Sequence, residues 1–166
     1  MPSRTAARKV RVVVADDSAV MRKIITTALG RHSEIDVVYV SQFKPDVVTL
    51  DVEMPEMDGI SAVKAIRKID SKLPVIMFSS LTQQGSQTAA TALTSGATDY
   101  VGKPATSAGS VGVFKVLDEQ LVPKIVGFGR RHQARVALGA LTPKASEASI
   151  GIASQAIPGS AAVPAG

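Results

Sequence analysis

Short Val- and Ile-rich runs that each end on a polar side chain are the feature that most constrains how this chain can fold. The runs VRVVVADD, DVVTLD, PVIMFS and DYVGK recur along the first two thirds of the sequence. Runs of this length and composition are typical of strands buried on both faces of a parallel sheet. The polar residues that end them are therefore expected to meet at the carboxyl edge of the sheet, where open α/β sheets bind ligands.

Segments with helical periodicity lie between these runs. The apolar spacing predicts helices over Ser18–Leu29, Gly59–Ile69, Ser86–Thr94 and Val111–Ile125. Strands are predicted over Val10–Ala15, Ile35–Val40, Val47–Leu50, Val75–Phe78 and Tyr100–Val101. This alternation predicts an α/β fold in which helices cover both faces of a doubly wound parallel sheet.

The composition agrees with one folded domain between two tails. Hydrophobic residues make up 45% of the chain, and there is no cysteine for disulfides or thiolate-bound zinc, which suits a reducing cytoplasm. We expect a basic, disordered N-terminus over residues 1–7, a domain over 8–128, and an Ala-, Ser-, Pro- and Gly-rich linker or tail over 129–166.

The net charge of +5 is carried by the ends of the chain. Residues 12–104 hold nine Lys or Arg against eleven Asp or Glu. Because no aromatic residues alternate with the terminal basic ones, we expect no specific nucleic-acid binding. No apolar run approaches the ~20 residues of a membrane-spanning helix, so no membrane partner is expected.

Five polar side chains end the predicted strands. Asp16 and Asp17 follow the first, and Asp51, Ser79 and Lys103 end later ones. Carboxylate oxygens are the ligands that Mg²⁺ prefers, and a lysine beside them suits a phosphoryl group. Taken singly, each residue has an ordinary role, such as capping a helix or facing solvent. As a set at one sheet edge, they predict a magnesium-dependent phosphoryl site, and repulsion among the acids should raise some of their pKa values.

Residues 8–128 resemble a receiver domain of bacterial two-component signalling. The resemblance lies in the strings VRVVVADDSAVMRKII, TLDVEMPEMDG and GATDYVGKP. It implies the flavodoxin-like strand order 2-1-3-4-5, with Asp51 as the phosphoacceptor and Lys103 beside the phosphoryl oxygens. It also implies Mg²⁺ ligation by Asp17, Asp51 and the backbone carbonyl of Glu53, with Asp16 acting through water.

The same resemblance assigns the conformational switch. Ser79 would be the switch hydroxyl, although Ser80 stands next to it, and Tyr100 would be the aromatic that moves with it. Pro104 resembles the family's cis-proline. A sensor histidine kinase would be the phosphoryl donor.

Two strings point to one subgroup of receivers. LDVEMPEMDG and SSLTQQGSQTAATAL resemble the regulatory half of the chemotaxis protein-glutamate methylesterase. Because no Gly-x-Ser-x-Gly-like nucleophile turn follows, we expect no esterase activity from this chain, and the esterase domain would belong to a parent protein. Two other functions stay open: a phosphorylation-incompetent interaction module, and a phosphatase with an aspartyl nucleophile.

One segment departs from the receiver pattern, because the helix between strands two and three is missing. Only the five residues SQFKP separate Val40 from Asp46, and they reach ~17–18 Å when extended. The connection between two strands that flank a third must span at least ~20 Å. The order 2-1-3-4-5 therefore cannot close with this segment as written.

Three explanations are available. Strand two leaves the sheet, it ends early, or residues have been lost by deletion, which we favour. Each leaves apolar sheet surface uncovered, so we expect association and a lower stability than that of a complete receiver.

Overall fold

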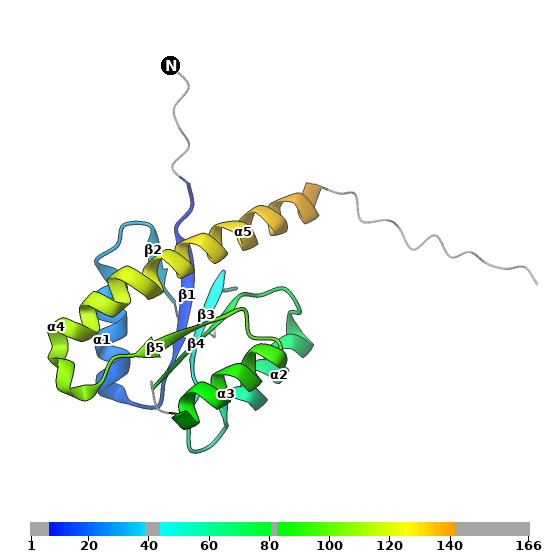
Figure 1. The fold of residues 1–166 in the computed structure, drawn as a ribbon. Coiled ribbons are helices and arrows are strands. Elements are labelled where there is room, and N and C mark those ends of the chain that lie inside the picture. The colour runs from blue at the N-terminus through cyan, green and yellow to red at the C-terminus, as the bar shows by residue number, and fades with distance from the viewer. Residues whose placement is uncertain (1–6, 39–43, 81–82, 142–166) are drawn as a thin grey trace, which may run out of the picture.

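The computed structural model describes residues 7–38, 44–80 and 83–141. Five parallel strands form one sheet in the order β2-β1-β3-β4-β5, which confirms the predicted fold class and strand order (Figure 1). The strands are β1 (Val10–Ala15), β2 (Ile35–Val37), β3 (Val47–Asp51), β4 (Val75–Ser80) and β5 (Asp99–Lys103).

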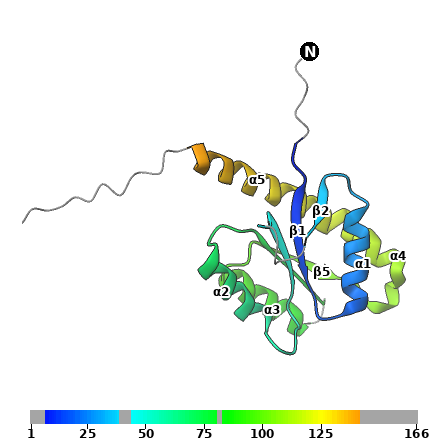
Figure 2. The same ribbon diagram turned by 180° about the vertical axis from the view of Figure 1, so that it is seen from behind.

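Helices cover both faces of the sheet. Figures 1 and 2 show α1 (Ala19–Gly30), α4 (Gly109–Val116) and α5 (Val122–Leu141) on one side, with α2 (Gly59–Ile69) and α3 (Gln83–Thr94) on the other. Each side has its own apolar core, around Ile25 and Leu121 on the first face and around Val63 and Met77 on the second. None of the helices in the described ranges is long and apolar enough to cross a bilayer.

The last helical segment is longer than predicted. A π-helical turn at Leu117–Leu121 joins α4 to α5, and it precedes Pro123. A proline inside a helix donates no hydrogen bond and its ring clashes with the carbonyl four residues earlier, so the wider turn makes room for it. Beyond residue 128, where we expected the linker to begin, α5 runs on to Leu141 because Gly129 and His132 continue its buried face.

The connection between β2 and β3 closes because β2 is short. The predicted strand to Val40 was wrong: β2 ends at Val37, and Val38 makes one more backbone bond, to Val12 of β1. Nine residues (38–46) therefore separate the two strands, and nine extended residues reach ~30 Å. The described residues of this connection, 38 and 44–46, hold no helix, and residues 39–43 lie outside the described ranges.

An apolar groove of about 440 Å³ lies on the sheet face beside α2. Its floor is formed by β1 and β3 and its wall by α2, through residues that include Val13, Val48, Leu50 and Ile66. At its rim Ile69 is 88% exposed. Among the described residues no helix lies over this groove, which is the uncovered sheet surface that the short connection predicts.

We expect a helix restored at this place to stabilise the protein. Insertion of about 13 residues with an apolar stripe between residues 40 and 44 should raise the melting temperature by roughly 10 °C. Burial of each large apolar side chain contributes about 1.5–3 kcal/mol before the cost of ordering the insert. Differential scanning calorimetry provides the measurement, with a Gly/Ser insert of equal length as the control. Equal melting temperatures for the two inserts would contradict the expectation.

The start of α2 carries a charge-dependent cap. Asp58 Oδ1 accepts a hydrogen bond from the Ser61 amide (2.8 Å) and Oδ2 from the Ser61 hydroxyl (2.8 Å). These bonds, the amide bond first, lower the pKa of Asp58 below its ordinary 3.8. A lowered pKa means that the cap stabilises the fold above pH 3.8 and loses this effect as the pH falls through the lowered value.

We therefore expect Asp58→Ala to reduce the urea midpoint at pH 7, by an amount that shrinks as the pH falls below 3.8. Asp58→Asn is the control, because asparagine is as good an N-cap as aspartate and has no charge to lose. A deficit for Asp58→Ala that is independent of pH would show that the carboxylate charge does not matter.

Candidate functional site

Three strand ends bring the predicted polar residues together. Asp16 follows β1, Asp51 ends β3 and Lys103 ends β5, so all three lie at the carboxyl edge of the sheet. Asp16 is 5% exposed and Asp51 is 4% exposed, whereas Asp17 faces solvent. Two buried carboxylates in one crevice need a compensating positive charge.

Lys103 provides this charge. Its Nζ lies 2.8 Å from Asp51 Oδ2 and 3.0 Å from Asp16 Oδ2, so one ammonium bridges both acids. It also lies 5.5 Å from the centre of the buried Phe78 ring, within the range of a cation–π contact. The other oxygens of the two acids accept backbone hydrogen bonds, Asp16 Oδ1 from Ser18 (2.9 Å) and Asp51 Oδ1 from Glu53 (3.1 Å).

Burial and the ion pairs shift the pKa values in this crevice. Burial raises the pKa of Asp51 above its ordinary value, although the hydrogen bonds from Lys103 and Glu53 partly oppose it. Repulsion from Asp16, the cause that we expected, contributes least. Burial alone would lower the pKa of Lys103, but its hydrogen bonds to Asp51 and Asp16 outweigh this effect, and its pKa is raised. The ammonium therefore stays charged at neutral pH.

The three acids also fit a divalent cation. Asp16, Asp17 and Asp51 each offer a carboxylate oxygen, and these oxygens lie within 4.8 Å of one another. Hard oxygen ligands at this spacing suit Mg²⁺, which keeps several waters in its coordination sphere. The aspartate cluster that the strand ends predicted is therefore present, and Asp17 and Asp51 are close enough to share one ion.

Comparison with known proteins identifies the family of this chain. The family model described as "Response regulator receiver domain" matches residues 12–109, more than half of the chain. The chain belongs to the response regulator receiver family. The protein-glutamate methylesterase/protein-glutamine glutaminase of Nocardioides sp. is 46% identical over 128 residues, which cover 70% of this chain and 35% of that protein. Its namesake from Trichodesmium erythraeum is 41% identical over 134 residues, covering 74% and 38%.

The solved structures agree with this assignment. The response regulator domain of Thermotoga maritima CheB superposes with a TM-score of 0.62 at 36% identity, over 74% of this chain and 98% of that one. The receiver is thus related to the regulatory domain of CheB, as the sequence resemblance indicated. The chain spans little more than a third of the length of the two methylesterase relatives named above.

The switch candidates of the receiver differ in their surroundings. Ser79 is fully buried, and its Oγ has no hydrogen-bond partner among the described residues. Ser80 Oγ instead donates to Glu53 Oε1 at 3.0 Å. The Tyr100 side chain packs against the core beneath α2 and α3, and its hydroxyl is also buried without a described partner. None of the described peptide bonds is cis, so the resemblance of Pro104 to a cis-proline was wrong for this structure.

Two residues that support the receiver site had no clear signal in the sequence. Arg22, on α1, donates from Nη1 to the Asp16 carbonyl (2.6 Å) and so fixes the acidic loop. Gly59 starts α2 so close to β3 that an added Cβ would lie 2.9 Å from Val52 Cα and 3.0 Å from the Asp51 carbonyl oxygen. The packing of α2 on β3 therefore excludes a side chain at this position.

Proposed function

We propose that this receiver accepts a phosphoryl group on Asp51 from the phosphohistidine of a chemotaxis sensor kinase in the cytoplasm. The observation that supports the proposal best is the position of Lys103, with its ammonium on Asp51 Oδ2 and two further carboxylates close by. The alternative is that Lys103 and the two buried acids form an ion pair that only stabilises the fold. Such an ion pair would not require a third acid close by, whereas the exposed Asp17 lies beside the other two.

The positions of these side chains support the following course of transfer. A carboxylate oxygen of Asp51 attacks phosphorus, the P–N bond to the kinase histidine breaks, and the imidazole takes up a proton. Lys103 neutralises the phosphoryl oxygens, since its raised pKa keeps it charged. Mg²⁺ bound by Asp17 and Asp51, by the Glu53 backbone carbonyl and through water by Asp16 would neutralise further charge and align the donor.

Ser79 and Tyr100 would transmit the change. A phosphoryl group on Asp51 offers new acceptor oxygens, and the Ser79 hydroxyl has an unused donor. A bond between them would repack the end of β4 and allow Tyr100 to respond on β5. Because the methylesterase relatives carry the regulatory span that this chain matches, we propose that the switch controls a protein-glutamate methylesterase output.

Incubation with a small phosphoryl donor tests the proposal directly. The full chain is treated with acetyl phosphate with Mg²⁺ or with EDTA, and intact-mass spectrometry follows the adduct. We expect one acid-stable, base-labile phosphoryl group that forms only with Mg²⁺, because acyl phosphates hydrolyse in base. No adduct would favour an interaction module, and continuous turnover of a phosphomonoester would favour a phosphatase.

A further inference from the structure

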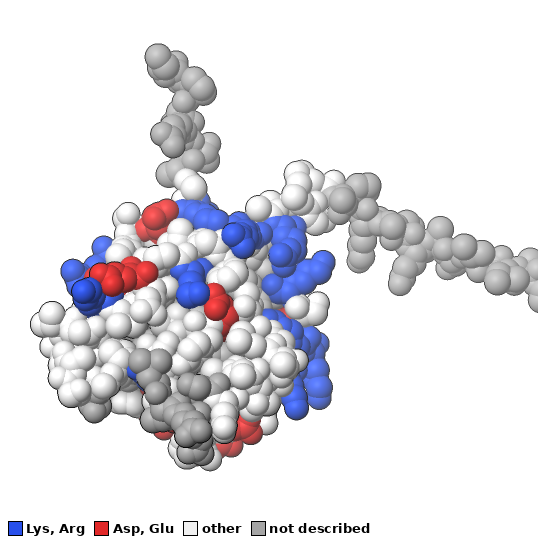
Figure 3. All heavy atoms as spheres, in the orientation of Figure 1, with Lys and Arg blue, Asp and Glu red and all other residues white. Residues whose placement is uncertain are grey.

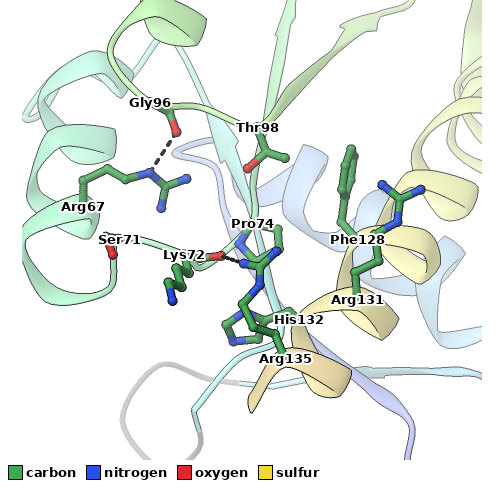
Figure 4. A pocket seen from close by; sticks show the side chains of 10 residues that line it. All are labelled: Arg67, Ser71, Lys72, Pro74, Gly96, Thr98, Phe128, Arg131, His132 and Arg135. Carbon is green, nitrogen blue, oxygen red and sulfur yellow. Dashed lines mark hydrogen bonds between the residues drawn. The ribbon is translucent and has the colours of Figure 1, made fainter. Parts of the chain in front are cut away.

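A second hollow lies at the opposite edge of the sheet from Asp51. Pro74 precedes β4 and Thr98 precedes β5, so it faces the amino ends of these strands. Its volume is about 560 Å³, within the range of small-molecule sites. Figure 4 shows side chains from the α2 segment, from the two strand starts and from α5 gathered around it.

The hollow is lined by cations and by no acid. Arg67, Lys72, Arg131 and Arg135 all line it, and none of them pairs with a carboxylate among the described residues. The neighbouring Asp70 does not line the hollow. Its Oδ1 accepts from the backbone amides of residues 72 and 73, and its charge attracts Arg67. Figure 3 shows Lys and Arg gathered on the side from which α5 projects. Like charges held together without acids repel one another unless an anion lies between them.

The Arg67 guanidinium is fixed by hydrogen bonds and still has an unused donor nitrogen. Its Nε donates to the Gly96 carbonyl (2.8 Å), and its Nη1 to the carbonyls of Leu73 (2.7 Å) and Asp70 (3.2 Å). These bonds fix the guanidinium plane and leave Nη2 without a partner among the described residues. On the α5 side, Arg135 Nη1 is 3.4 Å from the Lys72 carbonyl, so both guanidinium groups border the same space (Figure 4). Planar arginine groups placed in this way bind phosphate oxygens well.

His132 provides an independent indication of a ligand. It lines the hollow, is only 6% exposed, and its Nδ1 is buried with no hydrogen-bond partner among the described residues. Most buried polar atoms in proteins have a hydrogen-bond partner, so the unpaired ring nitrogen is available to a ligand that reaches the His132 ring. The Phe128 ring forms an apolar wall beside it, with the Arg131 guanidinium 5.7 Å from the ring centre.

We propose that this hollow binds a small organic polyphosphate, of the class of nucleoside di- and triphosphates. Its phosphates would lie among Arg67, Arg135 and His132, and its ring against Phe128. The cations gather around one hollow instead of following an extended ridge, which favours a small molecule over nucleic acid. The site is separate from the Asp51 crevice and does not depend on phosphorylation there.

Isothermal titration calorimetry with ATP and with inorganic pyrophosphate tests this proposal. The full chain is titrated in EDTA, so that no divalent cation carries the phosphates to the acidic crevice. The variant Arg131→Gln/Arg135→Gln is compared with Lys23→Gln/Lys115→Gln, which loses the same charge from exposed positions elsewhere on α1 and α4. Nuclear magnetic resonance maps the bound ligand in parallel.

We expect saturable one-to-one binding that weakens at least about ten-fold in the arginine variant and less than about two-fold in the lysine variant. Resonances of Gly96, Thr98 and the His132 ring should shift, and ATP should bind more tightly than pyrophosphate because of the ring. Equal weakening in both variants, shifts at Asp16 and Asp51, absence of saturable binding, or tighter binding of duplex DNA would each overturn the proposal. If the double variant fails to fold, Arg135→Gln alone takes its place.

Discussion

Asp51→Asn should abolish the Mg²⁺-dependent phosphoryl adduct completely. Asparagine has nearly the same shape but lacks the anionic oxygen that attacks phosphorus. The fold should persist, because Lys103 keeps its ion pair with Asp16 at 3.0 Å. Intact-mass spectrometry after incubation with acetyl phosphate gives the measurement, and the circular dichroism spectrum verifies folding.

Asp36→Asn serves as the matched control, because Asp36 is an exposed aspartate on β2, away from the carboxyl edge. It should form the adduct as the unmodified chain does. If Asp51→Asn still carries a phosphoryl group while folded, another residue is the acceptor and the proposed function fails in its central assignment.

Lys103→Met should have the largest effect on stability. The side chains of Asp16 and Asp51 are 2% and 4% exposed, and without the ammonium both charges are buried unpaired. Removing one partner of a buried ion pair costs about 3–5 kcal/mol in the free energy of unfolding. Urea denaturation at pH 7 measures it, with Lys23→Met, an exposed lysine on α1, as the control.

Two further observations distinguish this cause from lost packing. Burial already raises the pKa of Asp51 above its ordinary value, and removing Lys103 should raise it further. A raised carboxyl pKa in the folded state means that stability falls as the pH rises from the unfolded value to the folded one. The deficit of Lys103→Met should therefore shrink in acid, and Mg²⁺ should restore part of it at pH 7. If neither acid nor Mg²⁺ changes the loss of stability in Lys103→Met, the loss would come from the missing packing of the lysine side chain.

Local patterns were sufficient to predict most of the framework. The Val- and Ile-rich runs predicted all five strands, because residues of this kind are typical of a sheet that is buried on both faces. The 3.6-residue spacing gave α1 and α2 almost to the residue. Asp16, Asp51 and Lys103 were found for the same reason, since residues that end parallel strands must share one edge of the sheet.

The remaining features depend on contacts between segments that are distant in the sequence. β2 ends at Val37 because the chain must return to β3, a requirement of the topology that the apolar residues up to Val40 do not reveal. The different surroundings of Ser79 and Ser80 also come from the tertiary structure, since the first hydroxyl is buried and the second reaches Glu53. The basic hollow forms only because side chains of α5 lie near Pro74 and Thr98, which precede β4 and β5. Hydrophobic periodicity specifies which face of an element is buried, whereas tertiary packing sets where the element ends and which distant side chains it meets.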